Sequence, residues 1–261
     1  MKTIFNLSNG HVIQALKTYF DRMGLDGQCF ASCFLFLLVS SLVFLIWPQL
    51  DIWVSTYFYH ADGYFPANQN AFVMLIYEGI PWLGRITFLF AMLITLIAIV
   101  RPSKISRRHW RRASAFSLVV ILGIGFLVHA VLKDAMGRPR PRDVQVFAGP
   151  THFVPVFTAS NFCSTNCSFV SGHAALGFSL ISLGMLGVRK RRHFWFVVGA
   201  TTGTFVGLVR IAQGGHFLSD VVFAFIAIWF VHLLIRTCWF RFRAWQIFCK
   251  ENRSSRVNQN S

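Results

Sequence analysis

The stretch FSLVVILGIGFLVHAVLKDAMGRPRPR, residues 116–142, decides what kind of protein this is. Residues 116–132 are almost entirely apolar, and about 20 such residues cross the hydrocarbon core of a bilayer as a helix. Similar runs recur along the chain, which is 55% hydrophobic and 13% charged, against about 25% charged in a soluble domain. Strands do not explain runs of this length. We therefore predict an all-α integral membrane protein.

Six apolar segments predict six transmembrane helices in one bundle, at residues 29–47, 80–100, 113–132, 172–188, 194–209 and 221–236. Residues 29–236 would then form one membrane domain. Residues 1–28 have the amphipathic pattern of a segment that lies on a membrane surface, and residues 237–261 form a basic tail.

The distribution of positive charge predicts the orientation. Most of the 25 Lys and Arg residues fall in the two termini and in the linkers 101–112 and 189–193. Six spans place these segments on one side, and the positive-inside rule assigns that side to the cytoplasm. The net charge of +16 is then a topology signal, so we expect the lipid bilayer, and not nucleic acid, as partner. We expect a multi-pass protein of the cell inner membrane with both termini cytoplasmic.

Six cations break this rule, because they fall at the outer ends of spans or in outer loops: Arg85, Lys133, Arg138, Arg140, Arg142 and Arg210. Positive charge on the outside opposes insertion, so we expect a function to hold it there. A single cation of this kind is usually explained by snorkelling of its long side chain to the headgroups. Snorkelling gives no reason for several cations to gather on one face with two histidines and a carboxylate.

The other polar residues expected on that face supply complementary chemistry. Ser171, Gly172 and His173 begin a predicted helix, whose free N–H groups favour an anion, although Ser171 could act only as an N-cap. His216 and Asp220 are spaced i, i+4, so the carboxylate can orient the imidazole as a nucleophile or base. With the cations they form a set for phosphoryl transfer without metal, so neither a metal nor a cofactor is expected.

Three motifs resemble the signature of the type 2 phosphatidic acid phosphatase superfamily: Lys133-x6-Arg140-Pro141, Ser171-Gly172-His173 and Arg210-x5-His216-x3-Asp220. The resemblance covers about residues 30–236, with Val170 in place of the usual Pro and Val209 in place of the usual Ser. It implies that His216 attacks phosphorus, that Asp220 orients His216, and that His173 protonates the leaving oxygen. The phosphoryl oxygens would be held by Lys133, Arg140, Arg210, Ser171 and Gly172.

The loop CSTNCSFVSGH, residues 163–173, is similar to that of bacterial lipid A 1-phosphatases. The similarity predicts a phosphorylated membrane lipid as substrate, lipid A 1-phosphate first, with the active site facing the periplasm. Undecaprenyl diphosphate, phosphatidylglycerophosphate and phosphatidic acid stay open as substrates. Arg138 and Arg142 fall outside the signature; snorkelling is the prediction for both, and contact with a headgroup or a second phosphate is the alternative.

Two further questions stay open at this point. Cys163 and Cys167, four residues apart in the outer loop, either form a local disulfide or remain free thiols. A non-enzymatic anion transporter or lipid-binding scaffold is the alternative to an enzyme, although cations clustered at one face disfavour a transport path. Mutation of His216 separates the two, because an enzyme would lose nearly all activity and a binding protein would lose little.

Overall fold

The computed structural model describes residues 26–101, 105–133 and 136–259, and regular structure in these ranges is helical apart from two isolated β-bridges. Five helices are long and apolar enough to cross a bilayer: Asp26–Ile46, Ala71–Val100, Arg107–Lys133, Arg189–Ala212 and Leu218–Gln246. They overlap five of the six predicted spans. The predicted amphipathic segment 1–28 lies outside the described residues except for residues 26–28.

The fourth predicted span, 172–188, is a shorter element than expected. Helix α6 (Gly172–Phe178) continues into the 3-10 helix η5 (Ser179–Gly184) and ends there. At about 1.5 Å per residue this is roughly 20 Å, against ~30 Å of hydrocarbon. Among the described residues, five helices thus have spanning length, and the fourth predicted span is a shorter helix, most of whose residues are buried.

Glycine allows this short helix to approach α7 (Arg189–Ala212) very closely. A Cβ on Gly177 of α6 would lie 2.7 Å from the Gly203 Cα of α7, which no real side chain tolerates. Small residues let membrane helices pack backbone against backbone in this way. The packing fixes the start of α6, where Ser171, Gly172 and His173 lie.

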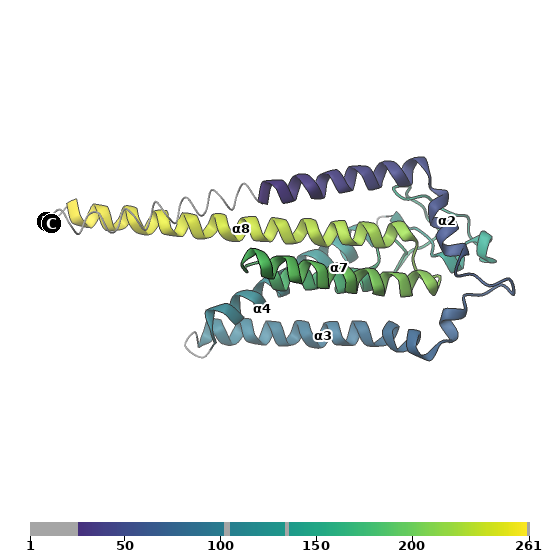
Figure 1. The fold of residues 1–261 in the computed structure, drawn as a ribbon, viewed down its shortest axis with the longest axis horizontal. Coiled ribbons are helices and arrows are strands. Elements are labelled where there is room, and N and C mark those ends of the chain that lie inside the picture. The colour runs from purple at the N-terminus through teal and green to yellow at the C-terminus, as the bar shows by residue number, and fades with distance from the viewer. Residues whose placement is uncertain (1–25, 102–104, 134–135, 260–261) are drawn as a thin grey trace.

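Helix α8 (Leu218–Gln259) runs along most of the molecule's length (Figure 1). Its first half is largely buried, with Ala224 and Ile228 inaccessible to solvent. The sequence predicted that the last span ends at residue 236, and the helix itself continues beyond that residue to Gln259. No Gly or Pro interrupts residues 218–259, and the basic tail therefore continues the helix.

Two other helices bring polar residues to the end of the bundle at which α6 and α8 begin. Helix α3 (Ala71–Val100) begins earlier than predicted, because Asn70 caps it by accepting hydrogen bonds from the backbone N–H groups of Phe72 and Val73. Helix α4 (Arg107–Val119) continues into the π-helix η2 (Val120–Lys133), which ends at Lys133. Wide π-helical turns often occur near functional sites.

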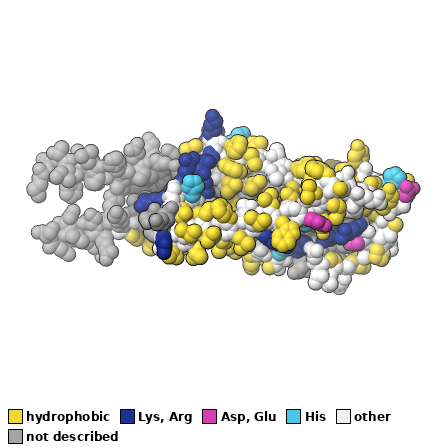
Figure 2. All heavy atoms as spheres, turned by 90° about the horizontal axis from the view of Figure 1, so that it is seen from below, with side chains coloured by type: hydrophobic (Ala, Val, Ile, Leu, Met, Phe, Trp, Pro, Cys, Tyr) yellow, Lys and Arg dark blue, Asp and Glu magenta, His cyan; other side chains and the backbone are white. Residues whose placement is uncertain are grey.

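Short elements close this end: α2 (Gln49–Thr56), η1 (Pro66–Gln69), η3 (Pro141–Asp143) and η4 (Gln145–Phe147). They pack on a small core of Phe65, Val144, Phe147 and Phe217. Figure 2 shows Lys and Arg side chains gathered at two levels, with a mainly hydrophobic surface between them. This pattern suits a bundle that crosses a bilayer.

Candidate active site

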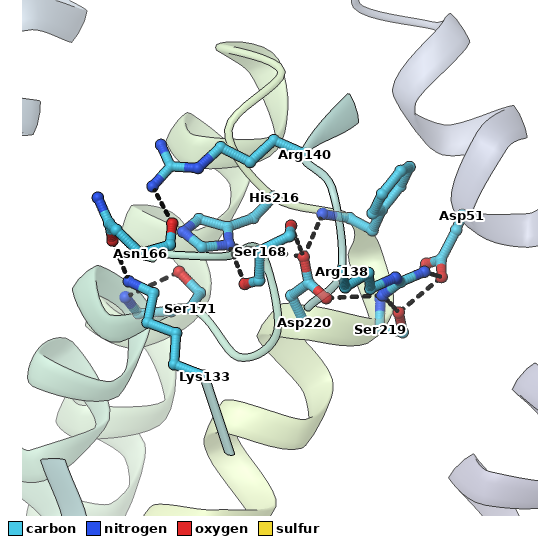
Figure 3. A network of polar contacts seen from close by, with 12 residues as sticks. Asp51, Lys133, Arg138, Arg140, Asn166, Ser168, Ser171, His216, Ser219 and Asp220 are labelled. Carbon is cyan, nitrogen blue, oxygen red and sulfur yellow. Dashed lines mark hydrogen bonds and ion pairs between the residues drawn. The ribbon is translucent and has the colours of Figure 1, made fainter. Parts of the chain in front are cut away.

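The structure brings the eight residues predicted for catalysis and phosphate binding to one end of the bundle. Figure 3 shows Lys133, Arg140, Ser171, His216 and Asp220 within one network of polar contacts. The other three lie beside these residues: Gly172 and His173 follow Ser171 in the first turn of α6, and Arg210 contacts Tyr77, on which His173 stacks. They come from the end of η2, the loop before α6, the ends of α6 and α7, and the start of α8.

His216 lies in the turn between α7 and α8, which Gly214 allows by adopting a left-handed φ of 62°. Its Nδ1 is 2.7 Å from the Ser168 carbonyl oxygen and 3.5 Å from Asp220 Oδ2. Because a carbonyl only accepts, Nδ1 carries the proton and Nε2 keeps its lone pair. The nearer acceptor is thus the Ser168 carbonyl and not the carboxylate that the sequence suggested.

Burial sets the protonation state of this imidazole. His216 is 1% exposed, and the loss of hydration lowers its pKa to about 4, although the Asp220 carboxylate acts in the opposite direction. At neutral pH the ring is therefore uncharged. An uncharged ring with a lone pair on Nε2 is the nucleophilic form of histidine.

Asp220, in the first turn of α8, is held by several donors. Its Oδ2 accepts from the Ser168 hydroxyl at 2.5 Å and from the Phe217 N–H at 2.8 Å. Its Oδ1 accepts from Arg138 at 2.7 Å. Ser168 thus contacts both members of the pair, with its carbonyl on His216 and its hydroxyl on Asp220. The relative position of His216 and Asp220 is fixed from two sides.

Arg138 is the residue whose prediction was most clearly wrong. It does not snorkel and cannot touch a headgroup, because it is 1% exposed. Its guanidinium pairs with Asp220 and with Asp51, each at 2.7 Å, and donates to the Val154 carbonyl at 2.9 Å. It also lies 4.4 Å from the centre of the Phe217 ring. Two buried carboxylates and an aromatic face explain why the cation stays inside.

Asp51 is the far end of this network, and sequence reasoning missed it. It lies in the first turn of α2 and accepts hydrogen bonds from the Ser219 N–H at 2.8 Å and the Ser219 hydroxyl at 2.6 Å. Burial raises the pKa of Asp51, and the Arg138 guanidinium opposes that rise. The carboxylate ties α2 to the start of α8. A lone Asp in the apolar segment LDIWV was the available signal.

Asn166 organises two of the predicted cations. Its side-chain oxygen accepts from Lys133 Nζ at 2.6 Å, and its backbone carbonyl accepts from Arg140 at 2.8 Å. Its φ of 52° lies in the left-handed region, which Asn adopts more readily than most residues. Cys163 and Cys167 form a disulfide that closes the loop around it, which resolves the alternative left open by the sequence. The position of Asn166 between the two cysteines was a signal we did not use.

Arg140 and Arg142 differ in their surroundings. Burial lowers the pKa of Arg140, and the neighbouring charge of Arg142 adds to this. A guanidinium titrates so far above neutrality that Arg140 remains a cation. The Arg142 side chain is half-exposed, 4.0 Å from Asp143. Arg142 therefore lies at the solvent side of the cluster, as a surface cation would.

Tyr77 of α3 connects Arg210 with His173. The Arg210 guanidinium lies 4.4 Å from the centre of the Tyr77 ring, and the His173 ring stacks on Tyr77 with centroids 5.2 Å apart. His173 Nε2 is 3.2 Å from the Tyr77 carbonyl oxygen, so Nε2 carries a proton there. Tyr77 was missed because the predicted second span began at residue 80.

A cavity of about 360 Å³ lies beside Lys133, Asn166 and His173. Lys133, Asn166 and His173 line its polar part. The rest of its wall is formed by α3, η2 and α6, mostly by apolar residues: Pro81, Gly84, Phe88, Val120, Ile124 and Leu176. Arg85 and His129 also line it, and sequence reasoning gave neither a role in the site. The polar and apolar parts together fit an amphiphilic molecule.

Comparison with known proteins agrees with this site. Residues 114–244 match the PAP2 superfamily. A lipid A 4'-phosphatase of Francisella tularensis subsp. novicida is 35% identical over 201 residues, which cover 74% of this chain and 89% of the relative. Lipid A 4'-phosphatases of Rhizobium etli and Rhizobium leguminosarum are 28% and 29% identical, over 71% of this chain and 77% and 85% of their own lengths. No solved structure gives a significant match.

Proposed function

Because the chain belongs to the PAP2 superfamily and is a membrane lipid phosphatase, we propose that it removes a phosphate from lipid A through a phosphohistidine at His216. The observation that carries the mechanism is the buried imidazole of His216. Its Nδ1 is bonded to a backbone carbonyl, so the Nε2 lone pair is available for attack.

The chemistry follows in two steps. In the first, the Nε2 lone pair of His216 forms a bond to phosphorus as the phosphorus–oxygen bond to the lipid breaks. His173 enters this step as the imidazolium, gives one of its two ring protons to the leaving oxygen and becomes neutral. In the second, water attacks the same phosphorus, gives a proton to His173, and the phosphorus–nitrogen bond breaks. The lipid hydroxyl and inorganic phosphate are the products. Asp220 stabilises the positive charge that His216 acquires, because its Oδ2 is 3.5 Å from Nδ1.

Three cations replace a metal ion in this scheme. Lys133, Arg140 and Arg210 offer donors to the phosphoryl oxygens, where negative charge develops during transfer. We therefore expect hydrolysis to continue in EDTA. Ser171 and Gly172 are proposed to bind the same oxygens. Ser171 also caps α6, with its hydroxyl accepting from the Ala174 N–H at 3.4 Å.

The amphiphilic cavity supports a lipid substrate. Its polar part contains His173 and Lys133, and its apolar part lies between the short α6 and two helices long enough to span a bilayer. A phosphate could bind at the polar part while the lipid's apolar portion stays between the helices. We propose that this end of the bundle faces the periplasm, because most Lys and Arg residues fall at the opposite end.

The proposal also has to say which phosphate of lipid A is removed, the 1-phosphate or the 4'-phosphate. All three matched relatives carry the name lipid A 4'-phosphatase, whereas the loop at residues 163–173 suggested the 1-phosphate. We propose the 4'-phosphate, since those relatives align over most of this chain while the loop comparison covers only 11 residues.

The test is phosphate release by purified protein in detergent micelles containing EDTA. Lipid A monophosphorylated at position 1 or at position 4' would be compared with undecaprenyl diphosphate and phosphatidylglycerophosphate, with His216→Ala as the inactive control. We expect the 4'-monophosphate to have the highest kcat/KM. A preference of tenfold or more, about 1.4 kcal/mol, for the 1-monophosphate overturns the position, and the same preference for another lipid overturns lipid A as substrate.

A further inference from the structure

A second cluster of positive charge lies at the other end of α4, away from Lys133 and the candidate active site. It surrounds a cavity of about 560 Å³ formed by the start of α4 and the turn before α7. Five guanidinium groups line this cavity: Arg107, Arg108, Arg111, Arg112 and Arg191. The proposed reaction uses none of them, and the positive-inside rule explains their side of the membrane but not their gathering around one cavity.

The five side chains have no counter-charge within the described parts of the chain. None of them forms an ion pair or a side-chain hydrogen bond there. Two nearby arginines outside the cavity do have a counter-charge, because Asp26 lies 2.7 Å from Arg236 and 3.9 Å from Arg192. The Nε atom of Arg111 is buried and has no hydrogen-bond partner among the residues that the structure describes. Buried donors are nearly always paired, so Arg111 indicates an acceptor that comes from outside the chain.

An adjoining cavity distinguishes a lipid from a free anion. It measures about 800 Å³, shares Arg107 and Arg111 with the first, and is lined by Trp110, Trp239 and Phe242. The Trp110 Nε1 atom is likewise buried, with no hydrogen-bond partner in the described part of the chain. Aromatic side chains beside cations at a membrane boundary suit a molecule with a charged head and an apolar body.

We propose that the two cavities together bind the headgroup of an anionic lipid that carries two phosphates, in the leaflet opposite the catalytic end. Guanidinium forks match phosphate oxygens, and five of them exceed what one phosphate can engage. The aromatic cavity takes the glycerol backbone and the start of the acyl chains. Because the cavities join the start of α4 to α7 and α8, the bound lipid stabilises the folded bundle.

The experiment is thermal unfolding of the full-length protein in micelles of a short-chain phosphatidylcholine, titrated with either cardiolipin or sodium pyrophosphate. Cardiolipin should raise the Tm of the wild type, and pyrophosphate at the same phosphate concentration should not. The double variant Arg111→Gln/Arg191→Gln should need about tenfold more cardiolipin, or more, for the half-maximal shift. The matched control Arg189→Gln/Lys190→Gln removes the same charge from the first turn of α7 outside the cavity, and should respond as the wild type does.

Three results would overturn the proposal. An equal loss of response in both double variants would mean that only surface potential attracts the lipid. A shift with pyrophosphate as large as the shift with cardiolipin would assign the cavity to a soluble phosphate anion. No shift with either probe would remove the site. If Arg111→Gln/Arg191→Gln does not fold, a second double variant takes its place. It is Arg107→Gln/Arg108→Gln, which changes two exposed side chains of the same cavity. It should likewise need about tenfold more cardiolipin, or more, for the half-maximal shift.

Discussion

At the scale of single residues, the protonation state of His216 decides whether the site can act as a nucleophile. Its pKa of about 4 lies below the ordinary value of about 6.5. The folded protein therefore stays unprotonated at His216 while an unfolded chain takes up the proton. As the pH falls from about 6.5 to about 4, the free energy of unfolding should decrease, because protons bind preferentially to the unfolded state.

This pKa can be measured directly. In protein labelled with 15N-histidine, the His216 ring, identified by the signal that His216→Ala removes, should titrate well below pH 6.5 and carry its proton on Nδ1 at neutral pH. NMR avoids the ambiguity of a pH–rate profile, in which the substrate phosphate itself titrates near pH 6. A midpoint at or above 6.5, or a proton on Nε2 at neutral pH, would contradict the account of the nucleophile.

Arg138 gives a second prediction at this scale. Arg138→Lys keeps the charge but cannot bridge Asp51 and Asp220 with one planar group, so Asp220 should shift and kcat/KM should fall by about a hundredfold or more. Arg142→Lys, four positions along in the half-exposed part of the cluster, is the matched control and should lose little. The measurement is kcat/KM together with Tm. Similar activity for the two variants would show that the buried network does not position the catalytic pair.

The sequence predicted the residues that share a motif and missed those that depend on distant contacts. The spacing of Lys133, Arg140, His173 and His216 already indicates phosphoryl-transfer chemistry. Arg138 meets Asp51 across 87 residues of sequence, and no local pattern reveals that contact. The role of Tyr77 likewise depends on how closely α3 approaches α6. Such roles follow from the packing of helices, which periodicity alone does not define.

At the scale of elements, the close packing of α6 on α7 controls where His173 lies. Gly177→Ala should push the two helices apart, because its Cβ would lie 2.7 Å from the Gly203 Cα. We expect a loss of about 1–3 kcal/mol in stability, seen as a lower Tm, together with a lower kcat. Gly79→Ala in α3, where a Cβ would meet nothing within 4 Å, is the control. Equal Tm values for the two variants would show that the glycine contact is not needed.

The sequence predicted that a helix is present more reliably than it predicted the residues at which the helix begins and ends. Five of the six predicted spans overlap helices of spanning length, because apolar runs of this length have few alternatives in a membrane. The start of α3 depends on the Asn70 cap, and the end of α8 depends on the lack of a helix-breaking residue after position 236. The short α6 could not be separated from a full span, because its apolar sequence continues beyond the helix to residue 188.

At the scale of the whole molecule, the distribution of Lys and Arg predicts that the catalytic end faces the periplasm and that the termini face the cytoplasm. In a background without the four free cysteines, Pro150→Cys should react with an impermeant thiol reagent in intact cells, because position 150 is exposed at the catalytic end. His109→Cys, exposed near the other end, should react only after permeabilisation. The reverse pattern would invert the topology and place the proposed reaction in the cytoplasmic leaflet.

The central claim is that this membrane phosphatase transfers the phosphoryl group to His216. The most direct measurement is mass spectrometry of the protein quenched in alkali during turnover, since a phosphohistidine survives alkali and is lost in acid. We predict a phosphoryl group on the peptide that contains His216, its loss on brief acid treatment, and its absence from His216→Ala. Rapid turnover by His216→Ala, or a phosphoryl group found on a different residue, would contradict the mechanism.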